Sequence, residues 1–258
     1  MRRVVFNQKG GVGKSTIAVN LAASAACRGK RVLVVDLDPQ GNASHYLTGE
    51  LESDPASGAA GLFEQMLSIS LFGKKPLEFV RPTPFEGVSL LAAHPQLSEM
   101  MGKLESRYKM FKLKEALDSL DGHFDEVWID TPPALNFYTR SALIAADRCL
   151  IPFDCDTFSR QALLALIDNV AEIRADHNPT LEIEGIVVNQ FQPRASLPRR
   201  LVEQLRADGL PVLDPPLPAS VRVRESHEAC TPMPWFDARH KLTQAFGELY
   251  GSLAPARQ

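Results

Sequence analysis

Short apolar runs rich in β-branched residues alternate with longer helical stretches along this chain, and this alternation constrains the fold more than any other feature. Strands are expected at Arg3–Asn7, Arg31–Asp36, Phe124–Asp130, Arg148–Phe153 and Glu184–Asn189. Helices are expected between them, at Ser15–Arg28, Phe137–Ala146 and Ser159–Ala175. Apolar strands separated by helices are typical of a parallel sheet covered on both faces. The sequence therefore predicts an α/β fold with a mainly parallel, twisted sheet and helices on both faces.

The chain has 258 residues and is 45% hydrophobic, which is enough to bury a large core. No break in composition divides it, so we expect a single domain over residues 1–258. The polar, turn-rich stretch between Gly49 and Ala60 is interpreted as a mobile loop rather than a linker. The segment from Glu50 to Arg107 is the hardest to interpret, with a short strand expected at Val88–Ala92.

Composition limits the classes of protein that this chain can belong to. No apolar run approaches the roughly 20 residues that span a bilayer, and no signal peptide is apparent, so a cytoplasmic protein is expected. Four cysteines, without a C-x-x-C pair, are expected to be buried thiols in a reducing compartment: Cys27, Cys149, Cys155 and Cys230. With 28 basic and 31 acidic residues the net charge is −3. Any nucleic-acid binding would therefore need a local basic patch.

The most specific motif is Gln8–Thr16 (QKGGVGKST), which lies between the first expected strand and the first expected helix. Its glycines allow backbone N–H groups to turn inward around a phosphate, at the positive end of the helix. We expect Lys14 to contact the β- and γ-phosphates and the Ser15 hydroxyl to bind magnesium. The strict pattern has glycine where this chain has Gln8, so the motif is a variant. The nucleotide-binding residues expected from it are Gly10, Gly11, Val12, Gly13, Lys14, Ser15 and Thr16.

Acidic residues follow two other expected strands. Asp130 ends the strand Phe124–Asp130 and occupies the Walker B position, where it would hold magnesium through water. Asp36 and Asp38 follow the second strand, two positions apart, so one can orient the attacking water while the other supports the metal. For a lone aspartate, a helix cap or turn would be the commoner role. The phosphate-binding motif favours the functional interpretation here.

At these residues the chain resembles a known family. KGGVGKST is similar to the deviant Walker A motif of the ParA/MinD superfamily, and VDLDPQGN resembles the segment after the second strand in ParA and Soj proteins. IDTPP resembles the family's Walker B, VVNQFQPR its adenine-side strand, and LPASVRVRESHEACTP the segment before its last helices. The resemblance covers essentially the whole chain. It is most specific up to His45 and weakest between Glu50 and Arg107.

The resemblance implies roles for particular residues. Lys9 would be the signature lysine that crosses a nucleotide-sandwich dimer to the partner's phosphates, and Asp38 would be the hydrolytic aspartate. Asn189 and Pro218 would lie beside the adenine. The arginines that we expect to bind DNA are Arg194, Arg199, Arg222 and Arg224, of which Arg222 matches a DNA-contacting arginine of the family. For any single arginine the simpler alternative is a solvated surface residue paired with Glu203, Asp208 or Glu225.

The implied function is that of a ParA-type ATPase that needs ATP and magnesium. It would form an ATP-dependent homodimer, bind nucleoid DNA without sequence preference, and position a plasmid, chromosome or protein assembly. A ParB-like or cargo-adaptor partner would stimulate hydrolysis. The chain begins at its first strand, so the N-terminal DNA-binding extension of larger plasmid ParA proteins and sequence-specific operator binding are not expected. The segment Lys241–Leu253 has few basic residues and is expected to be a packed helix, not a membrane-binding one.

Two alternatives remain open. One is a metabolic P-loop synthetase of the cobyrinic acid or dethiobiotin synthase type, which would need a substrate pocket and further catalytic groups. The other is a MinD-like regulatory ATPase without DNA binding. The six histidines, His45, His94 and His227 among them, are scattered and are expected to be surface or core residues. Iron–sulfur carriers with a similar loop have cluster-ligating cysteines that this chain lacks.

Overall fold

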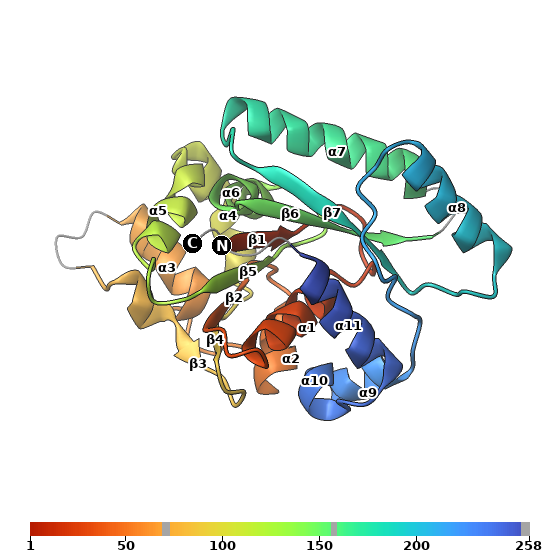
Figure 1. Ribbon diagram of the computed structural model, residues 1–258. Coiled ribbons are helices and arrows are strands. Elements are labelled where there is room, and N and C mark those ends of the chain that lie inside the picture. Colours follow the sequence, from red (N-terminus) through yellow and green to blue (C-terminus); the bar gives the residue numbers. More distant parts are fainter. Residues whose placement is uncertain (69–72, 156–158, 254–258) are drawn as a thin grey trace.

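A computed structural model describes residues 1–68, 73–155 and 159–253, and a seven-stranded sheet lies at its centre (Figure 1). The strands are β1 (Arg2–Val5), β2 (Val32–Asp36), β3 (Arg81–Pro82), β4 (Val88–Leu91), β5 (Glu126–Asp130), β6 (Arg148–Asp154) and β7 (Glu182–Asn189). Their order across the sheet is β3-β4-β2-β5-β1-β6-β7. Only the pair β3–β4 is antiparallel among these described strands. The predicted α/β fold with a mainly parallel sheet is confirmed.

Helices connect the strands and continue to the C-terminal part of the chain. They are α1 (Lys14–Ala26), α2 (Asn42–Thr48), α3 (Gly58–Leu67), η1 (Pro76–Phe79), α4 (Leu97–Ser106), η2 (Lys109–Phe111), α5 (Lys112–Asp118), α6 (Phe137–Ala145), α7 (Ser159–Asp176), α8 (Ser196–Ala207), α9 (Arg222–Glu228), α10 (Met233–Phe236) and α11 (Lys241–Ser252). Within the described part of the chain, none of them is both long and apolar enough to cross a bilayer.

The sheet separates two apolar cores, because successive strand residues point to opposite faces. Val32 and Val34 of β2 pack in the core beneath α1, α2, α10 and α11. Leu33 and Val35 pack in the other core, beneath α3 to α8. Figure 1 shows α1 and α11 on one side of the sheet and α6 and α7 on the other. Strands buried on both faces explain the near-continuous apolar runs in the sequence.

Several expected boundaries need correction. The stretch interpreted as a loop up to Ala60 already contains the start of α3, where the Ala59 amide donates to the Ala92 carbonyl at 2.8 Å. The first strand ends at Val5 rather than Asn7; beyond it, the Phe6 amide still donates to the Leu150 carbonyl at 3.0 Å, and the Asn7 side chain donates to the Pro152 carbonyl at 2.6 Å. The strand expected at Val88–Ala92 is present as β4.

The C-terminal segment forms α11, and the packed helix expected there is confirmed, because Leu242, Phe246 and Leu249 of α11 are buried in the same core as α1. The expectation of four buried thiols holds only for Cys149, which lies within β6. Cys27 is exposed, because it caps the end of α1 at the surface, and Cys155 and Cys230 are partly exposed.

Candidate functional site: a phosphate loop and an adjoining pocket

The loop between β1 and α1 has the backbone shape that the glycine motif predicts. Gly11 and Gly13 have φ angles of +75° and +88°, in the left-handed region that glycine adopts most readily. A Cβ at Gly13 would lie 2.3 Å from Asn189 Nδ2, and that same nitrogen donates to the Val12 carbonyl at 2.9 Å. The loop is therefore held open at the N-terminus of α1, where an anion is stabilised.

Lys14 lies inside this loop and is 7% exposed. Its Nζ donates to the Lys9 carbonyl at 3.0 Å, so the ammonium is tied to the inner side of the loop. Burial lowers the pKa of Lys14, and the charges of Asp130 and Asp38 oppose that effect. A cation between the loop and two carboxylates is well placed to meet phosphate groups.

Asp130 ends β5 and is fully buried. Its Oδ1 accepts from the Thr131 amide at 3.1 Å, while Oδ2 has no hydrogen-bond partner among the described residues. Burial raises the pKa of Asp130 well above its usual value, and the Asp36 charge adds to this, while the nearby Ser15 hydroxyl and the Lys14 charge act against it. A buried carboxylate oxygen next to a serine hydroxyl fits a magnesium ion, since this ion takes oxygen ligands and stabilises the charged carboxylate.

Asp36 and Asp38 have different surroundings. Asp36 Oδ2 accepts from both the amide and the hydroxyl of Ser44, each at 2.8 Å, and Oδ1 accepts from the Asp38 amide at 3.1 Å. Burial is the main cause that raises the pKa of Asp36 to about 6. Asp38 is 6% exposed, accepts from the Gln40 amide at 3.0 Å and faces a cavity. Asp36 therefore braces the loop after β2, whereas Asp38 faces the space above the phosphate loop.

Two adjoining cavities meet at this loop. The first, of about 360 Å³, we name the phosphate hollow; it is lined by Gly10, Gly11, Gly13, Lys14, Ser15, Thr16, Asp38, Gln40, Asn42, Pro133 and His227. Within the described residues, no group of three or more His, Cys, Asp or Glu side chains is arranged so that protein ligands alone could hold a metal ion.

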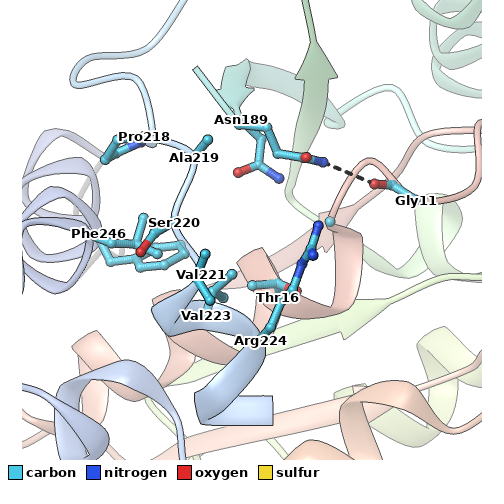
Figure 2. A pocket seen from close by; sticks show the side chains of 13 residues that line it. Gly11, Thr16, Asn189, Pro218, Ala219, Ser220, Val221, Val223, Arg224 and Phe246 are labelled. Carbon is cyan, nitrogen blue, oxygen red and sulfur yellow. Dashed lines mark hydrogen bonds between the residues drawn. The ribbon is translucent and has the colours of Figure 1, made fainter. Parts of the chain in front are cut away.

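The second cavity, the base pocket, has a volume of about 560 Å³ (Figure 2). The segment after residue 210 forms one wall, because it pairs alongside β7: the Leu217 amide donates to the Val188 carbonyl at 2.8 Å. This pairing brings Pro218 to the pocket opposite Asn189 (Figure 2). Gly11, Gly13 and Thr16 line both cavities, so the two cavities adjoin at these residues.

His227 of α9 is a site residue that the sequence interpretation missed. Its Nε2 lies 2.9 Å from Thr16 Oγ1, and its ring stacks on Tyr46 with centroids 3.7 Å apart. Burial, with a smaller effect from the charge of His45, lowers the pKa of His227 to about 4. The expectation of an ordinary surface or core histidine is corrected, since this ring lines the phosphate hollow. No local motif marks it, because Thr16 is 211 positions away.

The arginines expected to bind DNA occupy different environments. Arg194 and Arg199 are exposed. Arg222 pairs with Asp237 at 2.9 Å and with Glu225, and it lies over the Phe236 ring. Arg224 is exposed and lines the base pocket. Figure 1 shows α8, which carries Arg199, well apart from α9, which carries the last two, so these side chains come from two regions of the surface.

The sheet, the glycine loop ahead of α1 and the acidic strand ends define a nucleotide-binding protein of the P-loop class. The profile of the AAA domain family matches residues 3–183. The chain is 34% identical to the chromosome partitioning protein ParA of Myxococcus xanthus over 245 residues, which is 94% of this chain and 83% of that protein. It is 37% identical to the chromosome-partitioning ATPase Soj of Thermus thermophilus over 228 residues, 88% of this chain and 84% of the relative.

Among solved structures, the chain is similar to cobyrinic acid a,c-diamide synthase from Mycobacterium smegmatis with bound ADP and magnesium. The TM-score is 0.81 at 28% identity, over 97% of this chain and 92% of that one. This match and the matches to the partitioning proteins show that the chain belongs to the ParA/MinD superfamily.

Proposed function

We propose that this protein is a ParA-type ATPase, with residues 1–258 acting as a single domain, that hydrolyses ATP to ADP and phosphate with magnesium. The observation that carries the proposal is the convergence of Lys14, Ser15, Asp38 and Asp130 around one phosphate loop. The similarity to a Mycobacterium smegmatis protein that binds ADP and magnesium supports it.

Each group has a distinct part in this reaction. Lys14 neutralises charge on the β- and γ-phosphates. Ser15 and Asp130 hold the magnesium ion, and Asp36 supports them through the loop after β2. Asp38 orients a water that attacks the γ-phosphorus as the bond to the β-phosphate oxygen breaks, and it takes up the proton of that water. The base lies between Asn189 and the turn at Pro218.

ATP would also join two protomers face to face. Lys9 is exposed on the loop, and its side chain would reach the phosphates bound by the other protomer. The homodimer would bind DNA through phosphate contacts from Arg194, Arg199 and Arg222, without sequence preference. A ParB-like or cargo-adaptor protein would stimulate hydrolysis and release the dimer from the nucleoid. This function places the protein in the cytoplasm, in association with the nucleoid.

Nucleotide binding by Lys14→Ala tests the core of the proposal. The variant loses the charge that meets the phosphates, so ATP affinity should fall below detection in a calorimetric titration. Equal affinity in the variant and the wild type would disprove the assignment of the phosphate loop.

A second candidate function is supported by the name of the Mycobacterium smegmatis relative, a synthetase that would use ATP to activate a small carboxylate. The rate of phosphate release separates the candidates. DNA together with a partner should accelerate turnover by a ParA-type ATPase, whereas a synthetase should respond to a carboxylate substrate. Stimulation by a protein alone, with no DNA binding, would indicate a MinD-like regulatory ATPase.

A further inference from the structure

Arg224 extends from α9 over the base pocket. In Figure 2 its side chain reaches from the helix toward the turn at Gly11, on the same side of the pocket as Thr16. It is the one charged side chain among the described residues that line this pocket, which otherwise carries amide, hydroxyl, backbone and apolar groups. The pocket is therefore electropositive on the side nearest the phosphate loop.

The charge of Arg224 is not compensated by any partner among the described residues. Within residues 1–68, 73–155 and 159–253 its guanidinium makes no hydrogen bond or ion pair. Arg222, two positions earlier in the sequence, differs from it, because Asp237 and Glu225 pair with the Arg222 guanidinium at 2.9 Å and 2.5 Å. A guanidinium that faces a cavity without an acidic partner is suited to an anionic ligand.

The arrangement of the two cavities indicates which part of a nucleotide would be the anion that Arg224 binds. The β- and γ-phosphates belong in the phosphate hollow beside Lys14, and the base belongs between Asn189 and Pro218. The α-phosphate must then lie where the two cavities join, at Gly13 and Thr16. Arg224 borders that junction from the base-pocket side. The Thr16 hydroxyl is already bonded to His227, so it leaves the outer side of the junction to the arginine.

We propose that Arg224 binds the α-phosphate of the nucleotide and so holds α9 against it. The inference rests on the proposed nucleotide site and gives Arg224 a role other than the DNA contact expected from the sequence. The α-phosphate is common to AMP, ADP and ATP, so the contact should strengthen binding of all three alike.

The test compares Arg224→Gln and Arg224→Lys with Arg239→Gln. Arg239 is an exposed arginine between α10 and α11 that does not line the pocket, so its replacement changes the net charge equally. A fluorescent ADP analogue with magnesium is titrated into each protein, and unlabelled AMP, ATP and adenosine then compete for it. Circular dichroism melting confirms that each variant is folded.

We expect Arg224→Gln to weaken the binding of ADP, ATP and AMP by about tenfold, which is the loss typical of one hydrogen bond to a charged group. The binding of adenosine should be unchanged. Arg224→Lys should be intermediate, because it keeps the charge without the paired donors. Arg239→Gln should match the wild type. Wild-type affinity for ADP in Arg224→Gln would overturn the proposal, as would an equal loss for adenosine and AMP. A wild type that binds no nucleotide would instead refute the proposed function itself.

DNA binding at saturating ATP supplies an independent measurement. If Arg224 serves the nucleotide, Arg224→Gln should retain wild-type DNA affinity once the site is filled. A fall in DNA affinity at saturating ATP, with unchanged ADP affinity, would contradict the inference and return Arg224 to the DNA-binding surface.

Discussion

At the scale of single residues, the two aspartates after β2 illustrate how neighbouring carboxylates acquire different roles. Asp36 is enclosed by bonds from Ser44 and from the Asp38 amide, and it holds the start of α2 to the end of β2. Asp38 projects into the phosphate hollow. The first residue therefore maintains the geometry in which the second acts.

Substitution of each aspartate should separate these roles. Asp38→Ala should retain ATP binding and lower the hydrolysis rate by about 100-fold or more, because the attacking water loses its orienting base. Asp36→Ala should lower the free energy of unfolding by about 2–4 kcal/mol in urea titrations without nucleotide, because buried donors lose their acceptor. If Asp36→Ala were as stable as the wild type and only bound magnesium more weakly, Asp36 would contribute to magnesium binding and not to the stability of the fold.

His227 gives the protein a pH dependence of known sign. Its folded-state pKa of about 4 lies below the ordinary value of 6.5, so the folded protein favours the neutral ring. The stabilisation of the fold by the neutral His227 ring is complete above the pKa that His227 has in the unfolded state. It is lost as the pH falls toward the pKa that His227 has in the folded state. Between pH 7 and pH 5 we expect a loss on the order of 1 kcal/mol, reduced by the partial exposure of the ring.

The measurement is urea unfolding at several pH values, for the wild type and for His227→Gln, whose amide can still bond Thr16. The variant should show a shallower decline than the wild type over this range. His45, whose charge also acts on the His227 ring, is present in both proteins and is therefore controlled. Identical pH profiles would show that His227 does not titrate with folding.

At the scale of elements, the sequence was informative where the determinants are local. β2 and β5 were predictable because all five residues of each are buried, and the glycine loop because left-handed backbone demands glycine. β3 could not be predicted, because an edge strand of two residues has no hydrophobic pattern. The approach of α9 to the phosphate loop was not predictable either, because contacts over such sequence separations follow from tertiary packing.

The phosphate loop also provides a test of the face-to-face dimer. A Cβ at Gly10 would meet nothing within 4 Å in the single protomer, so Gly10→Val should fold and bind ADP. It should fail to dimerise with ATP, because the side chain would separate two closely apposed backbones. Lys9→Ala should fail as well, since it removes the charge that we propose crosses to the second site.

Light scattering with ATP and with ADP measures these outcomes. Gly102→Val on α4 is the matched control, because an added Cβ there also meets nothing within 4 Å. It should dimerise as the wild type does. ATP-dependent dimers of normal affinity in both Gly10→Val and Lys9→Ala would contradict the sandwich arrangement.

At the scale of the whole molecule, a net charge of −3 disfavours contact with DNA, so the proposed DNA binding would have to come from arginines on particular elements and from their duplication in the proposed dimer. Affinity for unrelated duplexes should require ATP, and log K should fall with log salt by about 0.9 for each phosphate neutralised. Arg199→Glu on α8 should weaken binding to every duplex alike. Anisotropy titrations at two salt concentrations measure this.

Lys103→Glu, an equal change of charge at an exposed position of α4, is the control and should have a much smaller effect. Preference for one duplex over the others, or an absence of binding at low salt with ATP, would rule out non-specific attachment to DNA.

The division of labour between the two cavities follows the order of the chain. Apart from His227, the residues that line the phosphate hollow lie within positions 3–183, the part that the family profile matches, whereas Asn189, Pro218, Arg224 and Phe246 of the base pocket lie beyond it. β7 spans this boundary and joins the parts through its register with β6. We therefore expect a chimaera joined within β7 to the C-terminal segment of a relative to combine that relative's base pocket with the phosphate loop of this chain, so β7 is a junction at which family members can exchange the two parts.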